Sequence, residues 1–224
     1  MWTRRPAPPS LNPSATAPRS DVTDVTDAQH ARELVEFTVD HFGGFHVMCN
    51  NAGVLESPRR FLDKDLRAFQ RVVAVDLFGV MLGSRYAALY MVGHGGGVIV
   101  NVASAAGIDP GTGMLPYRAA KAGGAHFTRC LAVGLGEPGV RVHCVAPVNI
   151  VTEINAAFDK AAVARLQPLA CQGRPADVAE VVLSTSPGTG PLRSTGVVLP
   201  LDGGVSTGTP ASRVRAPAGQ ESVM

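Results

Sequence analysis

Tyr117 and Lys121 stand four residues apart, and Ser104 precedes Tyr117 by thirteen residues. Four residues are about one helical turn, so on a helix the phenol and the ammonium project from the same face. A free tyrosine has a pKa of roughly 10, and a lysine charge within about 4–6 Å is expected to lower it by favouring the phenolate. Such a tyrosine can exchange a proton with an alcohol, so the three residues predict hydride transfer to a carbonyl.

The setting of this pair matters, because a Tyr-x-x-x-Lys spacing arises by accident in roughly 4% of chains of this composition. Residues 97–104 read as a buried parallel strand that ends at Ser104. Residues 46–49 read as another strand, and residues 50–53, with the sequence Asn-Asn-Ala-Gly, follow it. Ligands of open α/β sheets bind at the carboxyl ends of the strands. Both strand ends and the helix that carries Tyr117 are therefore expected to meet at one crevice.

Hydrophobic periodicity predicts an alternation of helices and strands. Helices are expected at residues 28–41, 63–90, 115–135, 155–166 and 176–183, and strands at residues 46–49, 97–104, 140–146 and 197–201. This alternation predicts an α/β fold, a doubly wound parallel sheet in three α/β/α layers. Residues 1–20 contain five prolines and no acidic residue, so they read as a disordered tail before a domain at residues 21–208. Residues 209–224 read as a second loose tail.

Composition limits the classes of function. A chain of 224 residues with 46% hydrophobic residues suits one domain with a sizeable core. Its net charge of +2 gives no basic face for nucleic acid. Without a run of eighteen apolar residues or an apolar leader, we expect a soluble cytoplasmic protein that does not enter a membrane. The four cysteines are expected to be small buried hydrophobes in a reducing compartment, and the spacing of the six histidines predicts no metal site.

From about Asp24 to Gly204 the chain resembles the short-chain dehydrogenase/reductase family. Besides the motifs above, the resemblance is carried by residues 24–27 (DVTD), 42–44 (FGG), 101–104 (NVAS), 141–147 (RVHCVAP), 173–179 (GRPADVA) and 201–204 (LDGG), in the family's order and spacing. It implies a Rossmann-like sheet and an oxidoreductase that transfers a hydride between a nicotinamide dinucleotide and a ketone or secondary alcohol. It also implies a homotetramer or a dimer.

The resemblance assigns roles to individual residues. Tyr117 is implied as the acid in reduction and the base in oxidation, Lys121 as the residue that holds the cofactor ribose, and Ser104 as a donor to the substrate oxygen. Two residues of the implied site also have a structural interpretation. Ser104 is then a serine at a strand end whose hydroxyl bonds to the backbone, and Thr152 is a helix N-cap. The implied cofactor-binding set adds Asp24 and Val25 on the adenine side, Asn51, Ala52 and Gly53 near the adenosine ribose, and Pro147, Ile150 and Thr152 near the nicotinamide. Asn50 is expected to clamp neighbouring strands instead.

Two positions depart from the family pattern. Asp76 stands where the long helix usually supplies an asparagine to the catalytic group, and its charge near Lys121 is expected to oppose a lowered pKa of Tyr117. Val148 stands where a glycine usually follows Pro147, and its branched side chain is expected to crowd the nicotinamide. Both departures favour a weak or silent enzyme.

The family's glycine-rich phosphate turn has no counterpart before Asp24, and the residue that selects between the two dinucleotides is missing with it. The cofactor is therefore expected to be NAD or NADP without a readable preference. Either a wrong start or frameshift replaced this segment, or a true short variant lost dinucleotide binding. The principal rival function is a non-catalytic scaffold that kept the fold.

A hydrolase is a weaker rival. Residues 94–97 resemble an esterase oxyanion loop and residues 204–208 fit Gly-x-Ser-x-Gly, but no histidine follows Ser206 to complete a triad.

In the oxidoreductase interpretation, residues 153–169 are the stretch expected to fold over the substrate. Their apolar side chains suggest an apolar small-molecule ligand.

Overall fold

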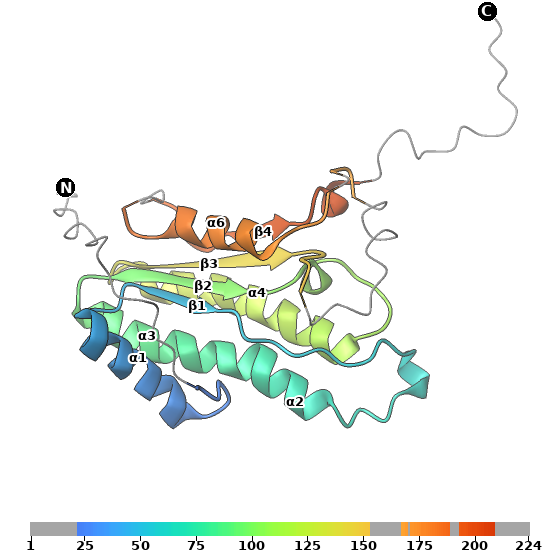
Figure 1. Cartoon of the computed structure of the whole chain (residues 1–224), viewed down its shortest axis with the longest axis horizontal. Coiled ribbons are helices and arrows are strands. Elements are labelled where there is room, and N and C mark those ends of the chain that lie inside the picture. The colour runs from blue at the N-terminus through green and yellow to red at the C-terminus, as the bar shows by residue number, and fades with distance from the viewer. Residues whose placement is uncertain (1–21, 153–166, 170, 189–192, 209–224) are drawn as a thin grey trace, which may run out of the picture.

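The computed structural model describes residues 22–152, 167–169, 171–188 and 193–208. Its sheet is parallel, with the strand order β1 (Val47–Asn50), β2 (Gly97–Val102), β3 (Val140–Pro147), β4 (Val198–Leu201). One face of the sheet carries α1 (Ala28–Phe42), α3 (Val80–Gly93) and α4 (Leu115–Leu135), and α6 (Pro175–Thr185) lies on the other (Figure 1). The predicted α/β class with helices on both faces is confirmed.

Alternating strand residues supply two cores. Ile99 and Val142 belong to the larger cluster, beneath α1, α3 and α4. Val98 and Val145 belong to the smaller cluster and pack against Val182 of α6. Because both faces of the two central strands are covered, β2 and β3 are almost continuously buried, which agrees with the buried strand predicted at residues 97–104.

The ends of α1 follow directly from its flanking residues. The Asp27 side chain caps the helix by accepting hydrogen bonds from the backbone N–H groups of Gln29 and His30. Gly43 ends the helix in the left-handed region, with φ of 75°. The predicted end of this helix at residue 41 lies within one residue of the observed end, and α4 has the predicted bounds.

The long helix predicted at residues 63–90 is wrong at its start. A short 3₁₀ turn, η1 (Phe61–Asp63), is followed by Leu66 in the left-handed region with φ of 56°, which a continuous helix excludes. The helical stretch then comprises α2 (Phe69–Val73), a π-helical segment η2 (Ala74–Gly79) and α3. By length and composition Phe69–Gly93 could cross a membrane, but half of it is buried within this domain, as in a core helix.

Three predicted segments lie outside the described residues. They are the tail at 1–20, the helix at 155–166 and the tail at 209–224. The remaining predicted helix, at 176–183, corresponds to α6, whose first turn carries a proline and the acidic Asp177.

A buried polar network fastens the sheet to two helices. The Asn50 amide donates to Oδ1 of Asn101 at 2.8 Å and to the Ser84 hydroxyl at 3.1 Å. The Asn101 amide donates in turn to the Thr128 hydroxyl at 3.0 Å, and that hydroxyl donates to the carbonyl of Gly124 at 2.9 Å. The network joins β1, β2, α3 and α4, so the predicted clamping role of Asn50 is confirmed.

Gly83 allows this network to form, because a Cβ atom there would lie 2.2 Å from Oδ1 of Asn50. We expect Gly83→Ala to displace the Asn50 amide and lower the free energy of unfolding by about 1–3 kcal/mol. Gly93→Ala, in the same helix with no atom within 4 Å of the added Cβ, is the control and is expected to be neutral or slightly stabilising. Urea unfolding measures both variants, and equal stabilities would contradict the prediction.

Candidate active site

A cleft of about 1050 Å³ opens at the carboxyl ends of β1, β2 and β3, between α4 and α6. Most of the predicted site residues line it, although they come from four separate segments of the chain. They are Asn51, Ala52, Gly53, Ser104, Tyr117, Lys121, Pro147, Ile150 and Thr152. The structure therefore brings together the predicted catalytic group and the predicted nicotinamide side in one place.

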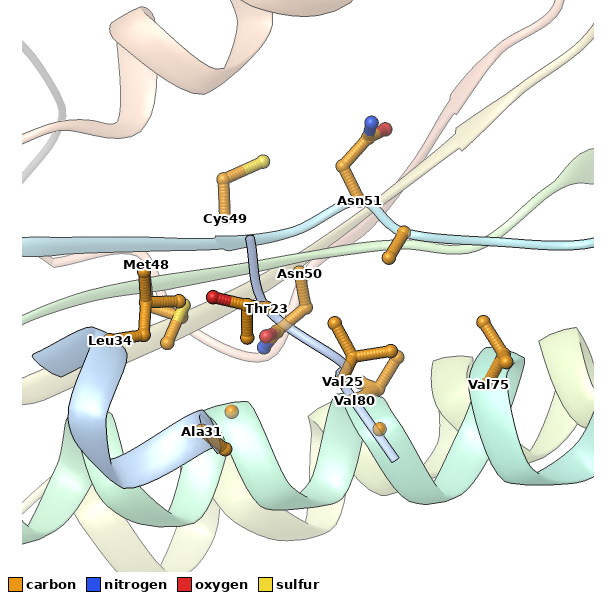
Figure 2. A pocket seen from close by; sticks show the side chains of 13 residues that line it. Thr23, Val25, Ala31, Leu34, Met48, Cys49, Asn50, Asn51, Val75 and Val80 are labelled. Atoms are coloured by element: carbon orange, nitrogen blue, oxygen red, sulfur yellow. The ribbon is translucent and has the colours of Figure 1, made fainter. Parts of the chain in front are cut away.

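β1 separates this cleft from a second cavity of about 80 Å³. Met48 and Asn50 point toward the smaller cavity, whereas Cys49 and Asn51 point to the opposite side (Figure 2). Cys49 is exposed because it lines the open cleft rather than the core. The expectation of four buried cysteines is thus wrong: all four are free, but only Cys144 is buried.

Asp24 and Val25 stand apart from the other predicted residues. Asp24 is exposed, and its carboxylate accepts hydrogen bonds from the backbone N–H of Thr26 at 2.9 Å and from the Thr26 hydroxyl at 2.8 Å, which lower its pKa. Val25 lines the smaller cavity. Cys49, Asn51 and Ala52 line both cavities, so the predicted adenine side adjoins the cleft around these three residues.

Asp76 and Lys121 form a buried ion pair. The distance from Nζ to Oδ1 is 3.2 Å, and the residues are only 1% and 4% exposed. Two backbone groups complete the pair: Val54 N–H donates to the carboxylate at 3.2 Å, and the ammonium donates to the carbonyl of Val102 at 3.0 Å. A Cβ atom at position 53 would lie 2.7 Å from Oδ1 of Asp76, so Gly53 is needed for this packing.

The Tyr117 phenol is half-buried, and Nζ of Lys121 lies 5.6 Å from the centre of its ring. Burial raises the pKa of Tyr117 above its ordinary value; a hydrogen bond with Ser104 lowers it, and the charge of Asp76 raises it further. The expectation that Lys121 lowers this pKa is wrong for this structure, because the ammonium is paired with Asp76. The predicted opposing effect of Asp76 is confirmed.

Ser104 lies two residues after the end of β2 and caps the short turn η3 (Ala105–Gly107). Its Oγ accepts a hydrogen bond from the backbone N–H of Ala106 at 3.2 Å. A hydroxyl has one donor as well as two acceptor positions, so Ser104 can still donate its proton. The structural and catalytic interpretations of this serine are therefore compatible.

The segment after β3 forms another wall of the cleft. Val148 lines the cleft where the family pattern has glycine, and the Thr152 hydroxyl donates to the carbonyl of Ile150 at 3.4 Å. The intervening Asn149 has φ of 52°, and its buried amide nitrogen has no hydrogen-bond partner among the described residues. The sequence motifs did not single out Asn149; asparagine's tolerance of the left-handed region was the only available indication.

The nicotinamide side of the cleft suits the ribose of a dinucleotide. Lys121 bonds Asp76 and Val102 among the described residues, which leaves one of its three ammonium donors for a ligand hydroxyl. Gly53, beside this ammonium, has no side chain to narrow the cleft. The missing glycine-rich phosphate turn stays a prediction, since residues 1–21 lie outside the described residues. The residues that are described fit the ribose end of the cofactor.

Comparisons with known proteins agree with this geometry. A family model described as short chain dehydrogenase matches residues 19–162. Cis-4-hydroxycyclohexanecarboxylate dehydrogenase of Sinomonas cyclohexanicum is 35% identical over 185 residues, covering 81% of this chain and 74% of the relative. Cyclohexanol dehydrogenase of Acinetobacter sp. (strain SE19) is 33% identical over 173 residues, covering 77% and 68%. The chain belongs to the short-chain dehydrogenase family.

A solved structure supports the same conclusion. ElxO with NADP bound has a TM-score of 0.76 and 26% sequence identity, over 83% of this chain and 77% of that one. Membership of this family supports an oxidoreductase role and a nicotinamide cofactor.

We expect Asp76→Asn to lower the pKa of Tyr117, because the substitution removes a negative charge that raises it and keeps an acceptor for Val54 N–H. A pH titration of tyrosinate absorbance measures the shift, and subtraction of the same titration for Tyr117→Phe isolates the one phenol. An unchanged or higher midpoint in Asp76→Asn would show that Asp76 does not control Tyr117.

Proposed function

We propose that this protein is a nicotinamide-dependent oxidoreductase that interconverts a secondary alcohol and a ketone. The observation that carries the proposal is the meeting of Ser104, Tyr117 and Lys121 in one cleft, from a strand end and one helix face. Folding alone does not require that arrangement. A bound nicotinamide ring would supply the hydride acceptor in oxidation and the hydride donor in reduction.

In reduction, the substrate carbonyl oxygen would lie between Ser104 and Tyr117. The Ser104 hydroxyl donates a hydrogen bond that stabilises negative charge on this oxygen, and Tyr117 transfers its phenolic proton to it as hydride reaches the carbon. In oxidation, the tyrosinate takes the hydroxyl proton from the alcohol. Because the pKa of Tyr117 is raised, the phenol is protonated near neutral pH. Reduction is therefore the direction favoured near neutral pH, and oxidation should accelerate as the pH rises.

The substrate class proposed is an alicyclic secondary alcohol and its ketone. Two relatives are named for ring alcohols, cis-4-hydroxycyclohexanecarboxylate and cyclohexanol. The cleft adds support through the apolar side chains of Val148, Val178 and Val182 in its lining. A saturated ring can bury its apolar surface against such side chains while its single oxygen faces Ser104.

A non-catalytic role is the second candidate, and the Asp76–Lys121 pair is the observation that favours it. A lysine whose charge is matched by a buried carboxylate gives less help to a tyrosinate. Val148, which lines the cleft, also occupies space that a glycine would leave free. A protein with these features could retain the fold and bind a ligand without turnover.

We also propose a homotetramer or dimer that forms through the two longest helical stretches. Large apolar side chains are exposed on these helices: Leu89 of α3 is 61% exposed and Val133 of α4 is 86% exposed. Sedimentation velocity at micromolar concentration tests this proposal, and a monomer under those conditions would exclude it.

We expect Tyr117→Phe to abolish turnover of cyclohexanol and cyclohexanone, because the ring remains while the proton is lost. Binding of NADH or NADPH, followed by cofactor fluorescence, should change less than about threefold, since binding does not need this proton.

Ser104→Ala should lower kcat by about 10²–10³-fold, because the substrate oxygen loses a hydrogen-bond donor. The enzyme proposal fails if the wild-type protein binds neither cofactor at millimolar concentration; binding without turnover would identify the non-catalytic relative.

A further inference from the structure

Residues 105–114 form the wall of the cleft between Ser104 and the helix that carries Tyr117. Five residues of this segment line the cleft: Ala105, Ala106, Asp109, Pro110 and Met114. The segment begins as the short turn η3 and ends at Met114, which enters α4 with φ of 48°, in the left-handed region. Such a segment needs contacts from outside itself to keep one conformation.

Arg118 supplies these contacts. Its Nε donates to the carbonyl of Gly113 at 3.2 Å, and its Nη1 donates to the carbonyls of Ala106 at 3.4 Å and Asp109 at 3.1 Å. One guanidinium thus holds both the beginning and the end of the segment. Its planar fork can donate to several carbonyls at once, whereas a lysine ammonium is a compact point charge on a flexible stem.

Two glycines allow residues 105–114 to pack closely against α4. A Cβ atom at position 111 would lie 2.4 Å from Nη2 of Arg118, and one at position 107 would lie 2.6 Å from the backbone nitrogen of Ala122. Gly111 has an ordinary φ, so its lack of a side chain matters here for close approach alone. Gly111 and Arg118 therefore form the two sides of one contact.

Ala106 connects this contact to the catalytic group through the two peptide units on either side of its Cα. Its carbonyl accepts from Arg118, and its N–H donates to Oγ of Ser104 at 3.2 Å. Because Ser104 accepts that hydrogen bond, its own proton remains free to point toward Tyr117 or a substrate oxygen. Holding the backbone of Ala106 therefore also holds the Ser104 hydroxyl in its donating orientation.

We propose that Arg118 is a positioning residue, which fixes residues 105–114 as the substrate-facing wall of the cleft and orients the Ser104 hydroxyl through the backbone of Ala106. The consequence for the reaction rests on the proposed function, but the clamp itself does not. Arg118 itself lines the cleft, but its guanidinium donates to the carbonyls of residues 106, 109 and 113 rather than to Ser104 or Tyr117. Its effects should reach the chemistry only through Ser104 and through the shape of the wall.

Hydrogen exchange tests the clamp without any turnover. In Arg118→Gln and in Gly111→Ala, we expect backbone amides of residues 105–114 to exchange at least about tenfold faster, because charge-assisted hydrogen bonds are lost. Arg118→Lys should not restore protection. Arg129→Gln removes the same charge from an exposed position on the same helix and should leave exchange unchanged. Wild-type exchange in Arg118→Gln would overturn the proposal.

The titration of Tyr117 tests the link to Ser104. The Ser104 hydrogen bond lowers the pKa of Tyr117, so both Ser104→Ala and Arg118→Gln should raise the tyrosinate midpoint. In the double variant the two effects should not add, because Arg118 acts through Ser104. Fully additive pKa effects in the double variant would show that Arg118 does not act through Ser104. If the wild-type protein catalyses the reaction, Arg118→Gln should raise KM for cyclohexanol at least tenfold and change NADH or NADPH affinity less than threefold. A wild-type protein without turnover would refute the proposed function. Hydrogen exchange and the tyrosinate titration would still test whether Arg118 holds residues 105–114.

Discussion

One buried charge pair, Asp76 with Lys121, joins the elements that build the cleft. The carboxylate comes from η2 and the ammonium from α4, and the two completing backbone groups come from the segment after β1 and from β2. Burying either charge alone would cost several kcal/mol, so each depends on the other and on its backbone bond. The positions of Gly53, Val54 and Val102 are constrained by the same requirement.

The ion pair also determines how the site is tuned. Because Asp76 matches the charge of Lys121, the phenol of Tyr117 is governed by its burial, by Asp76 and by Ser104, and only Ser104 lowers its pKa. The orientation of one hydroxyl therefore carries an effect that a lysine was expected to supply. This dependence explains why a contact remote from the reacting atoms, between Arg118 and the Ala106 peptide, is relevant to the chemistry.

The sequence predicted the sheet and α4 well, because long periodic runs and glycine stops depend on local patterns. It also predicted most of the residues that line one cleft, since strand ends of a parallel sheet must meet at one edge, but not the separate positions of Asp24 and Val25. It failed at Leu66, where a left-handed residue interrupts an apolar period, and at Cys49, whose exposure depends on what covers the strand. The Tyr117–Lys121 spacing mispredicted the direction of the Tyr117 pKa shift, because spacing does not contain the burial that raises this pKa. The opposing effect of Asp76 was predicted.

The π-helical segment η2 links the two sides of the predicted cofactor footprint. Asp76 holds Lys121 on the nicotinamide side, and Gly79, about one turn later, packs so closely on the adenine side that a Cβ atom there would lie 2.9 Å from Cγ2 of Val25. π-Helical turns are rare and occur often at functional sites. Val25 packs against this short segment, and Lys121 pairs with Asp76 within it, so one turn links the two sides. The departure at Asp76 is therefore structural as well as electrostatic, because it anchors that turn to α4.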